Sequence, residues 1–104
     1  MKLSDLSSVS PIDGRYSRLV TELQEIFSEY ALIKYRVFVE IEWFIHLSKQ
    51  PNIKELPNLT KQSLTFLSKI EKNFSLTEAR KVKNKEKKTN HDVKAVEYYL
   101  RDQF

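Results

Sequence analysis

The sequence predicts an all-α protein: a small helical domain of four to five helices preceded by an extended N-terminal arm. Two observations carry this prediction. The 104 residues include one glycine, whereas a hairpin-rich β protein needs many turn positions with positive φ. Apolar residues also recur at spacings of three and four along most of the chain, which is the helical period. We place the arm at residues 1–17 and the helical domain at residues 18–104, and the length allows one small domain.

The composition excludes several classes of function. The chain has no cysteine and two histidines, so disulfides, thiolate zinc sites, cysteine nucleophiles and a three-histidine metal site are excluded. The single glycine also excludes the glycine-rich loops that bind nucleotide phosphates. The N-terminus lacks a signal-peptide pattern and no apolar run approaches the length of a membrane span. We therefore expect a cytoplasmic protein with no metal and no membrane contact.

The arm is rich in serine and contains Pro11 and the pair Asp13-Gly14. These residue types predict a turn in which Gly14 takes a positive φ. After the arm, the apolar residues between Arg18 and Phe27 follow helical spacing and predict a short first helix.

Ser28 is a good cap for a second, longer helix over about residues 29–49. Its apolar residues form two stripes on opposite faces at 100° per residue. One stripe contains Tyr30, Ile33, Val37, Ile41 and Phe44, and the other contains Leu32, Val39 and Trp43. Such a helix is either the central helix of a small bundle, or one of its two stripes contacts another subunit or a further part of the polypeptide.

Two more helices are marked by their caps. Prolines and asparagines in residues 50–59 predict a connection, after which Thr60 can cap a helix that ends near Phe74. Ser75-Leu76-Thr77-Glu78 fits the capping box, in which the serine hydroxyl accepts from the glutamate amide and the glutamate carboxylate reaches back to the serine amide.

The run of residues 80–88 in the next helix contains six basic residues in nine. It fits a solvated helix face, a neighbourhood for a small anionic ligand, or a nucleic-acid surface. Stacking aromatic residues, which support nucleic-acid binding, are not interleaved in the run. We therefore predict no nucleic-acid partner.

The final helix is expected over residues 93–104, with Val93, Val96 and Leu100 on its apolar face and His91 and Ala95 on the opposite side. Thr89 or Asn90 is expected to cap it, and Asp92 suits the positive end of the helix dipole. This interpretation leaves His91 unnecessary for capping and free to meet a ligand.

Two polar clusters thus suit an anionic ligand: Arg15-Tyr16 and Asn90-His91-Asp92. Arginine offers a planar fork of donors, tyrosine adds a hydroxyl, and a helix start adds free amides. The residues alone indicate an anion site and leave its ligand open.

The segments that carry these clusters resemble a known family. Residues 10–16, Ser-Pro-Ile-Asp-Gly-Arg-Tyr, and residues 88–100, Lys-Thr-Asn-His-Asp-Val-Lys-Ala-Val-Glu-Tyr-Tyr-Leu, look like the N-terminal part of the adenylosuccinate lyase family in the fumarase and aspartase superfamily. The resemblance covers nearly the whole chain. It implies a several times longer homotetrameric enzyme that eliminates fumarate from adenylosuccinate to give AMP, and from the succinyl-aminoimidazole-carboxamide ribotide, without a cofactor.

The resemblance also implies roles for individual residues. It puts Arg15 and Tyr16 on the nucleotide phosphate. It puts Asn90, His91 and Asp92 in the same pocket, with His91 donating to substrate oxygens and able to assist proton transfer. These five are the predicted substrate-binding residues.

The family's catalytic groups are not in the segment. The base is a serine on a Ser-Ser-x-Met-Pro-x-Lys-x-Asn loop and the acid is a second histidine in the next domain. The sole methionine of this chain is Met1, so the loop is not in these residues, and we expect the segment alone to be inactive. The alternatives are a free-standing helical interaction module that uses the Trp43 stripe and a basic nucleic-acid-binding domain.

Overall fold

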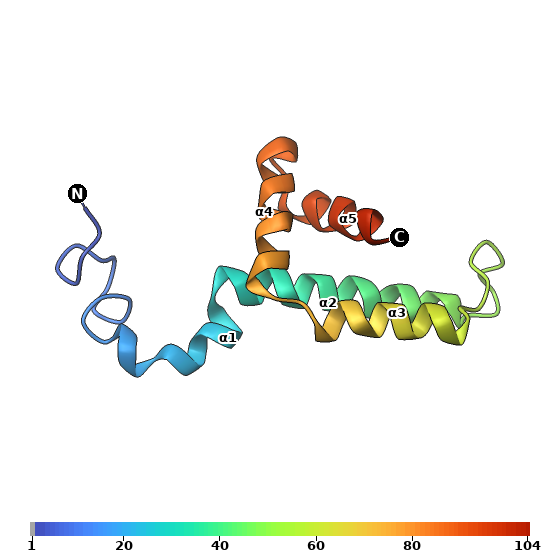
Figure 1. The fold of residues 1–104 in the computed structure, drawn as a ribbon, viewed down its shortest axis with the longest axis horizontal. Helices are drawn as coiled ribbons and strands as arrows, with labels where there is room; N and C mark the ends of the chain where they lie inside the picture. The colour runs from blue at the N-terminus through green and yellow to red at the C-terminus, as the bar shows by residue number, and fades with distance from the viewer. Residues whose placement is uncertain (1) are drawn as a thin grey trace. The chain divides into compact units, whose positions relative to one another are not determined.

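The computed structural model describes residues 2–104, which contain helices and no strand, and it confirms the all-α prediction (Figure 1). A turn-rich arm precedes two short 3₁₀ helices and five α-helices. Their bounds are η1 Ser17–Leu19, η2 Thr21–Leu23, α1 Gln24–Phe27, α2 Glu29–Ser48, α3 Lys61–Lys72, α4 Leu76–Thr89 and α5 Asp92–Gln103. The chain divides into two compact units, one ending at Leu32 and the other comprising residues 33–104. The predicted division into a functional arm, residues 1–17, and a helical domain, residues 18–104, stays a prediction.

The turn in the arm is held by local hydrogen bonds. The Ser10 amide donates to Asp13 Oδ1 at 2.8 Å, and the Tyr16 amide donates to the Pro11 carbonyl at 2.8 Å. The prediction of a positive φ at Gly14 is wrong. Glycine is needed there for space instead, because a Cβ would lie 2.8 Å from the carbonyl oxygen of Asp5.

The first helix predicted from Arg18 to Phe27 is also wrong in part. The structure has η1, η2 and the four-residue α1 in its place. Leu19, Ile26 and Phe27 are exposed. A segment this short depends on tertiary packing for helical stability, and these apolar side chains are not buried.

The long helix α2 follows the sequence prediction closely. The Ser28 hydroxyl accepts from the Ala31 amide at 3.1 Å and caps the helix. One apolar stripe is buried and the other is not. The buried stripe includes Ile33, Val37 and Ile41, whereas Leu32, Val39 and Trp43 of the other stripe are 45%, 60% and 55% exposed.

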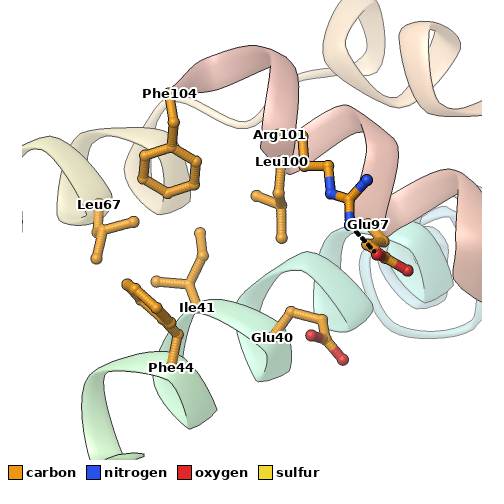
Figure 2. Close-up of a pocket in the computed structure, with 8 residues that line it drawn as sticks. All are labelled: Glu40, Ile41, Phe44, Leu67, Glu97, Leu100, Arg101 and Phe104. Carbon is orange, nitrogen blue, oxygen red and sulfur yellow. Dashed lines mark ion pairs between the residues drawn. The ribbon is translucent and has the colours of Figure 1, made fainter. Parts of the chain in front are cut away.

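The core of residues 33–104 contains buried side chains from α2, α3, α4 and α5, among them Ile41, Leu67, Val82 and Val96. α3 is capped by Thr60, whose hydroxyl accepts from the Ser63 amide at 3.1 Å, and it ends two residues before the predicted Phe74. A pocket of about 190 Å³ lies between α2, α3 and α5, and Figure 2 shows the side chains that line it. Its lining is mainly apolar and consists of Glu40, Ile41, Phe44, Leu67, Glu97, Leu100, Arg101 and Phe104. None of the five predicted site residues lines this pocket.

Helices α4 and α5 pack against each other (Figure 1). Ser75 caps α4 as predicted, since its hydroxyl accepts from the Glu78 amide at 3.4 Å. The carboxylate of Glu78 has a different role from the expected one. It accepts from the Tyr99 hydroxyl at 2.7 Å and from Lys81 Nζ at 3.0 Å. The capping-box glutamate therefore joins α4 to α5, because a buried phenol on α5 offers it a strong donor.

Candidate functional site

The turn between α4 and α5 begins with Asn90. Asn90 has φ 53° and ψ 29°, and its amide donates to the Glu86 carbonyl at 2.8 Å. This left-handed conformation ends α4, and asparagine tolerates it better than most residues. The expectation that Thr89 or Asn90 caps α5 is wrong. The Thr89 hydroxyl instead bonds to the amide and the carbonyl of His91 at 3.2 and 3.0 Å.

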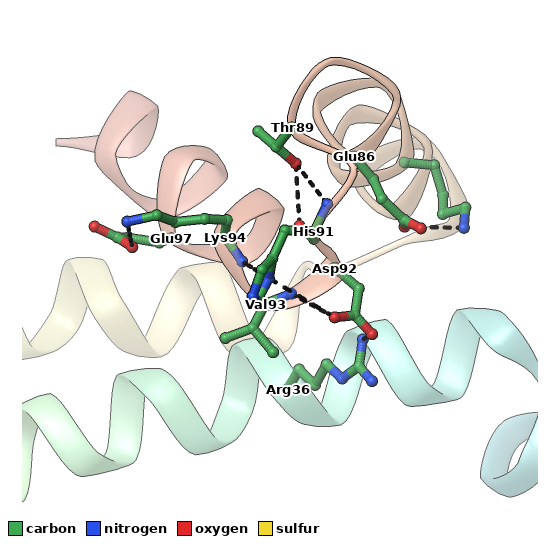
Figure 3. A network of polar contacts seen from close by, with 9 residues as sticks. Arg36, Glu86, Thr89, His91, Asp92, Val93, Lys94 and Glu97 are labelled. Carbon is green, nitrogen blue, oxygen red and sulfur yellow. Dashed lines mark hydrogen bonds and ion pairs between the residues drawn. The ribbon is translucent and has the colours of Figure 1, made fainter.

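His91 is the N-cap of α5. Its backbone is extended, and its ring atom Nδ1 accepts from the Lys94 amide at 3.3 Å (Figure 3). The expectation that His91 is unnecessary for capping is therefore wrong. After the left-handed Asn90 the chain becomes extended one residue later than expected, so His91 occupies the capping position and satisfies an otherwise free amide.

This cap determines which ring nitrogen of His91 can donate. A nitrogen that accepts a hydrogen bond carries no proton, so the neutral ring holds its proton on Nε2. The His91 side chain is 62% exposed. The imidazole is thus held at one nitrogen and offers an N–H donor at the other.

Asp92, the first residue of α5, is held on both carboxylate oxygens. Oδ1 accepts from the Val93 amide at 2.9 Å, and Oδ2 lies 2.8 Å from Arg36 Nη1 on α2 (Figure 3). The hydrogen bond from Val93 and the nearby Arg36 charge lower the pKa of Asp92 below its usual value. Arg36 was missed at the sequence level. The available signal is its place at the border of the buried stripe, between Ile33 and Val37.

The buried face of α5 is rotated from the predicted one. Ala95, Val96 and Tyr99 are buried, whereas Val93 is exposed. The placement of Ala95 on the solvent side and of Val93 in the core is therefore wrong. α4 packs against α5, and a helix covered by more than one neighbour buries a wider face than a single stripe.

The second predicted cluster, Arg15-Tyr16, follows the turn in the arm. The guanidinium carbon of Arg15 lies 5.0 Å from the centre of the Tyr16 ring, a distance typical of a cation–π contact. Both side chains are exposed. The structure thus brings together these two residues, and separately brings together Asn90, His91 and Asp92. The two clusters lie in different compact units.

Two kinds of feature, a cluster of metal-binding side chains and a membrane-spanning helix, are absent from the part of the chain that the structure describes. Within residues 2–104 no group of three or more histidine, aspartate or glutamate side chains is arranged to hold a metal ion. Among the same residues, no helix combines the length and the apolar character needed to cross a bilayer.

Comparison with known proteins gives the chain's relatives. No protein-family model matches it. The adenylosuccinate lyase of Legionella pneumophila (strain Corby) is 51% identical over all 104 residues, that of Dictyostelium discoideum is 50% identical over 103 residues, and that of Escherichia coli (strain K12) is 47% identical over 102 residues. These matches cover 98% to 100% of this chain but 22% to 23% of each relative. The chain therefore spans less than a quarter of the length of these enzymes.

Proposed function

We propose that this chain, which is homologous over its whole length to adenylosuccinate lyases, supplies substrate-binding residues to such a carbon–nitrogen lyase. The reaction is the elimination of fumarate from adenylosuccinate to give AMP, and from the succinyl-aminoimidazole-carboxamide ribotide. The observation that carries the proposal is the match across all 104 residues, because both polar clusters lie inside it.

The chemistry of elimination gives the clusters their roles. A base removes a proton from the succinyl carbon beside a carboxylate, the C–N bond breaks, and the departing nitrogen receives a proton from an acid. Negative charge develops on that carboxylate as the proton leaves. Fixed donors stabilise such charge more than they stabilise the ground state, and the Nε2–H of the capped His91 is a donor of this kind.

The remaining residues serve binding. Arg15 and Tyr16 present a guanidinium and a phenol that suit the nucleotide phosphate. Asn90 and Asp92 flank His91 and belong to the same substrate-binding cluster. His91 is also able to assist proton transfer, because its Nε2 is not used by the cap and can carry a proton to or from the substrate.

The proposal extends to the assembly. The whole enzyme is a cytoplasmic homotetramer that uses no cofactor, no metal and no nucleic acid. The 104 residues alone are inactive, because binding groups hold substrate without supplying the two proton transfers of the elimination.

A second candidate function is a helical interaction module. It is favoured by the exposure of Val39 and Trp43 on α2, because a contiguous exposed apolar patch marks an interaction surface. The two functions are distinguished by AMP binding, because only the substrate-binding role predicts that AMP binds at the two polar clusters.

An NMR titration of the chain with millimolar AMP tests the proposal. We expect amide shifts at Arg15, Tyr16 and residues 90–92. Arg15→Ala should weaken binding by about 2 kcal/mol, since a charge-assisted contact to phosphate is lost. No shift at either cluster, with or without shifts on the Trp43 stripe, contradicts the substrate-binding role.

His91→Asn sharpens this experiment. Asparagine is itself a good N-cap, so the variant keeps α5 and loses the Nε2–H donor. We expect intact circular dichroism and weaker AMP binding, and in a longer lyase that carries this chain roughly a tenfold or greater loss of turnover. His46→Asn is the matched control, because His46 lies on α2, stacked on Trp43. Unfolding of the His91 variant would indicate a purely structural histidine.

A further inference from the structure

The ion pair between Arg36 and Asp92 joins the middle of α2 to the first residue of α5 (Figure 3). The two residues are 56 positions apart in the sequence, and Arg36 Nη1 lies 2.8 Å from Asp92 Oδ2. We propose that Arg36 is a positioning residue of the substrate site, which acts through Asp92 to hold the first turn of α5 and so the donor nitrogen of His91. This inference rests on the proposed function.

The position of the pair along α5 supports this role. The hydrogen bond and the ion pair that join α5 to α4 lie further along the helix, where Tyr99 donates to Glu78 and Asp102 pairs with Lys85. The first turn is preceded by the left-handed residue Asn90, which ends α4, and by the extended residue His91. Arg36 therefore gives the first turn of α5 a direct ion pair to α2, whereas the two polar contacts with α4 hold later turns of the helix.

The orientation of His91 depends on the same turn. Its Nδ1 accepts from the Lys94 amide, and that amide keeps its place only while the first turn of α5 is formed. Asp92 belongs to this turn and bonds to the Val93 amide through its other oxygen. A carboxylate held at both oxygens therefore links Arg36 to the capped imidazole within one helical turn.

Charge gives a second effect through the same residue. An uncompensated carboxylate at position 92 would repel a substrate that carries phosphate and carboxylates. Arg36 neutralises Asp92 at 2.8 Å and so makes the site compatible with an anion. Both the positioning of the first turn and the charge neutralisation require Asp92, so a substitution at position 92 should remove both effects of Arg36.

The expected effect is modest in size. The side chains of Arg36 and Asp92 are 30% and 47% exposed, and partly exposed ion pairs contribute little to global stability. Arg36→Gln should therefore leave the chain folded. We expect AMP binding to weaken roughly threefold to fivefold, which corresponds to the loss of a well-oriented surface ion pair.

The test is a double-mutant cycle on the 104-residue chain with Arg36→Gln, Asp92→Asn and the double variant. Two signals are recorded without ligand, the hydrogen exchange of the Lys94 amide and the ¹⁵N signals of the His91 ring, and then the affinity for AMP. Arg36→Gln should speed the hydrogen exchange of the Lys94 amide and give ¹⁵N signals of a mixture of His91 tautomers. Arg36→Lys should keep the slow exchange and the single Nε2–H tautomer. Arg101→Gln is the control, because Arg101 forms an ion pair with Glu97 at 2.9 Å within α5, away from the first turn, and its side chain is 68% exposed.

The double-mutant cycle distinguishes a role of Arg36 that acts through Asp92 from a contribution of Arg36 to the packing of α2 in general. If Arg36 acts through Asp92, then Arg36→Gln adds nothing once position 92 is asparagine. Equal effects of Arg36→Gln in both backgrounds, or unchanged Lys94 and His91 signals in the single variant, overturn the inference. Because these two signals need no ligand, an absence of AMP binding by the unsubstituted chain counts against the proposed function alone.

Discussion

Glu71 gives residues 33–104 a stability that depends on pH near neutrality. Glu71 on α3 shares a hydrogen bond with Glu42 on α2, and its Oε1 is buried without a hydrogen-bond partner among the described residues. Burial, followed by the hydrogen bond and the charge of Glu42, raises the pKa of Glu71 from 4.5 to about 7. We predict that Glu71→Gln stabilises the chain above pH 7 and removes this dependence.

The sign and size follow from the two pKa values. Since folding raises the pKa of Glu71, its protonated form favours the folded state. The resulting stability is complete below about pH 4.5 and is lost as the pH rises through about 7. The separation between the two pKa values sets an upper bound of about 3 kcal/mol. The side chain is partly exposed, and solvent screening reduces the expected loss to about 1–2 kcal/mol.

The assay is urea unfolding followed by circular dichroism at pH 5 and pH 8. The unsubstituted chain should lose about 1–2 kcal/mol of unfolding free energy relative to Glu71→Gln between these two pH values. Glutamine keeps a neutral donor opposite Glu42, so the shared bond survives. Glu55→Gln, in the exposed connection between α2 and α3, should track the unsubstituted chain. A Glu71→Gln variant that is less stable at pH 8 than the unsubstituted chain would refute the reasoning.

Two other predictions rest on single contacts, and a third rests on the exposed stripe of α2 and on the catalytic groups expected elsewhere in the enzyme. Tyr99→Phe removes a buried hydroxyl that donates to Glu78 at 2.7 Å and should lower the unfolding free energy by about 1.5–3 kcal/mol in urea; an unchanged value would mean that this bond is not what joins α4 to α5. Gly14→Ala places a Cβ 2.8 Å from the Asp5 carbonyl and should shift NMR signals of the arm while leaving those of α3 to α5 in place; unmoved arm signals would contradict the close approach. The chain alone should release no fumarate from adenylosuccinate and should self-associate through the exposed α2 stripe, which sedimentation and Trp43 fluorescence on dilution would detect; a strict monomer with buried Trp43, or clear turnover, would contradict this.

The sequence by itself determined the features that depend on neighbours within four residues. Ser28, Thr60 and Ser75 cap their helices as expected, because each hydroxyl bonds to an amide three residues ahead and needs nothing else. The two stripes of α2 were also readable, since helical geometry alone fixes which side chains share a face. The resemblance in residues 10–16 and 88–100 pointed to the family to which the relatives belong.

Tertiary structure decided the features that depend on distant parts of the chain. Gly14 is needed because the Asp5 carbonyl approaches it. The His91 cap of α5 is local, and it was missed because the left-handed conformation of Asn90 was not foreseen. Asp92 is held by Arg36, which no local pattern connects to it. Spacing along a helix predicts which residues share a face, but the direction in which a turn sends the next helix, and the cation that meets it there, follow from packing between elements far apart in sequence.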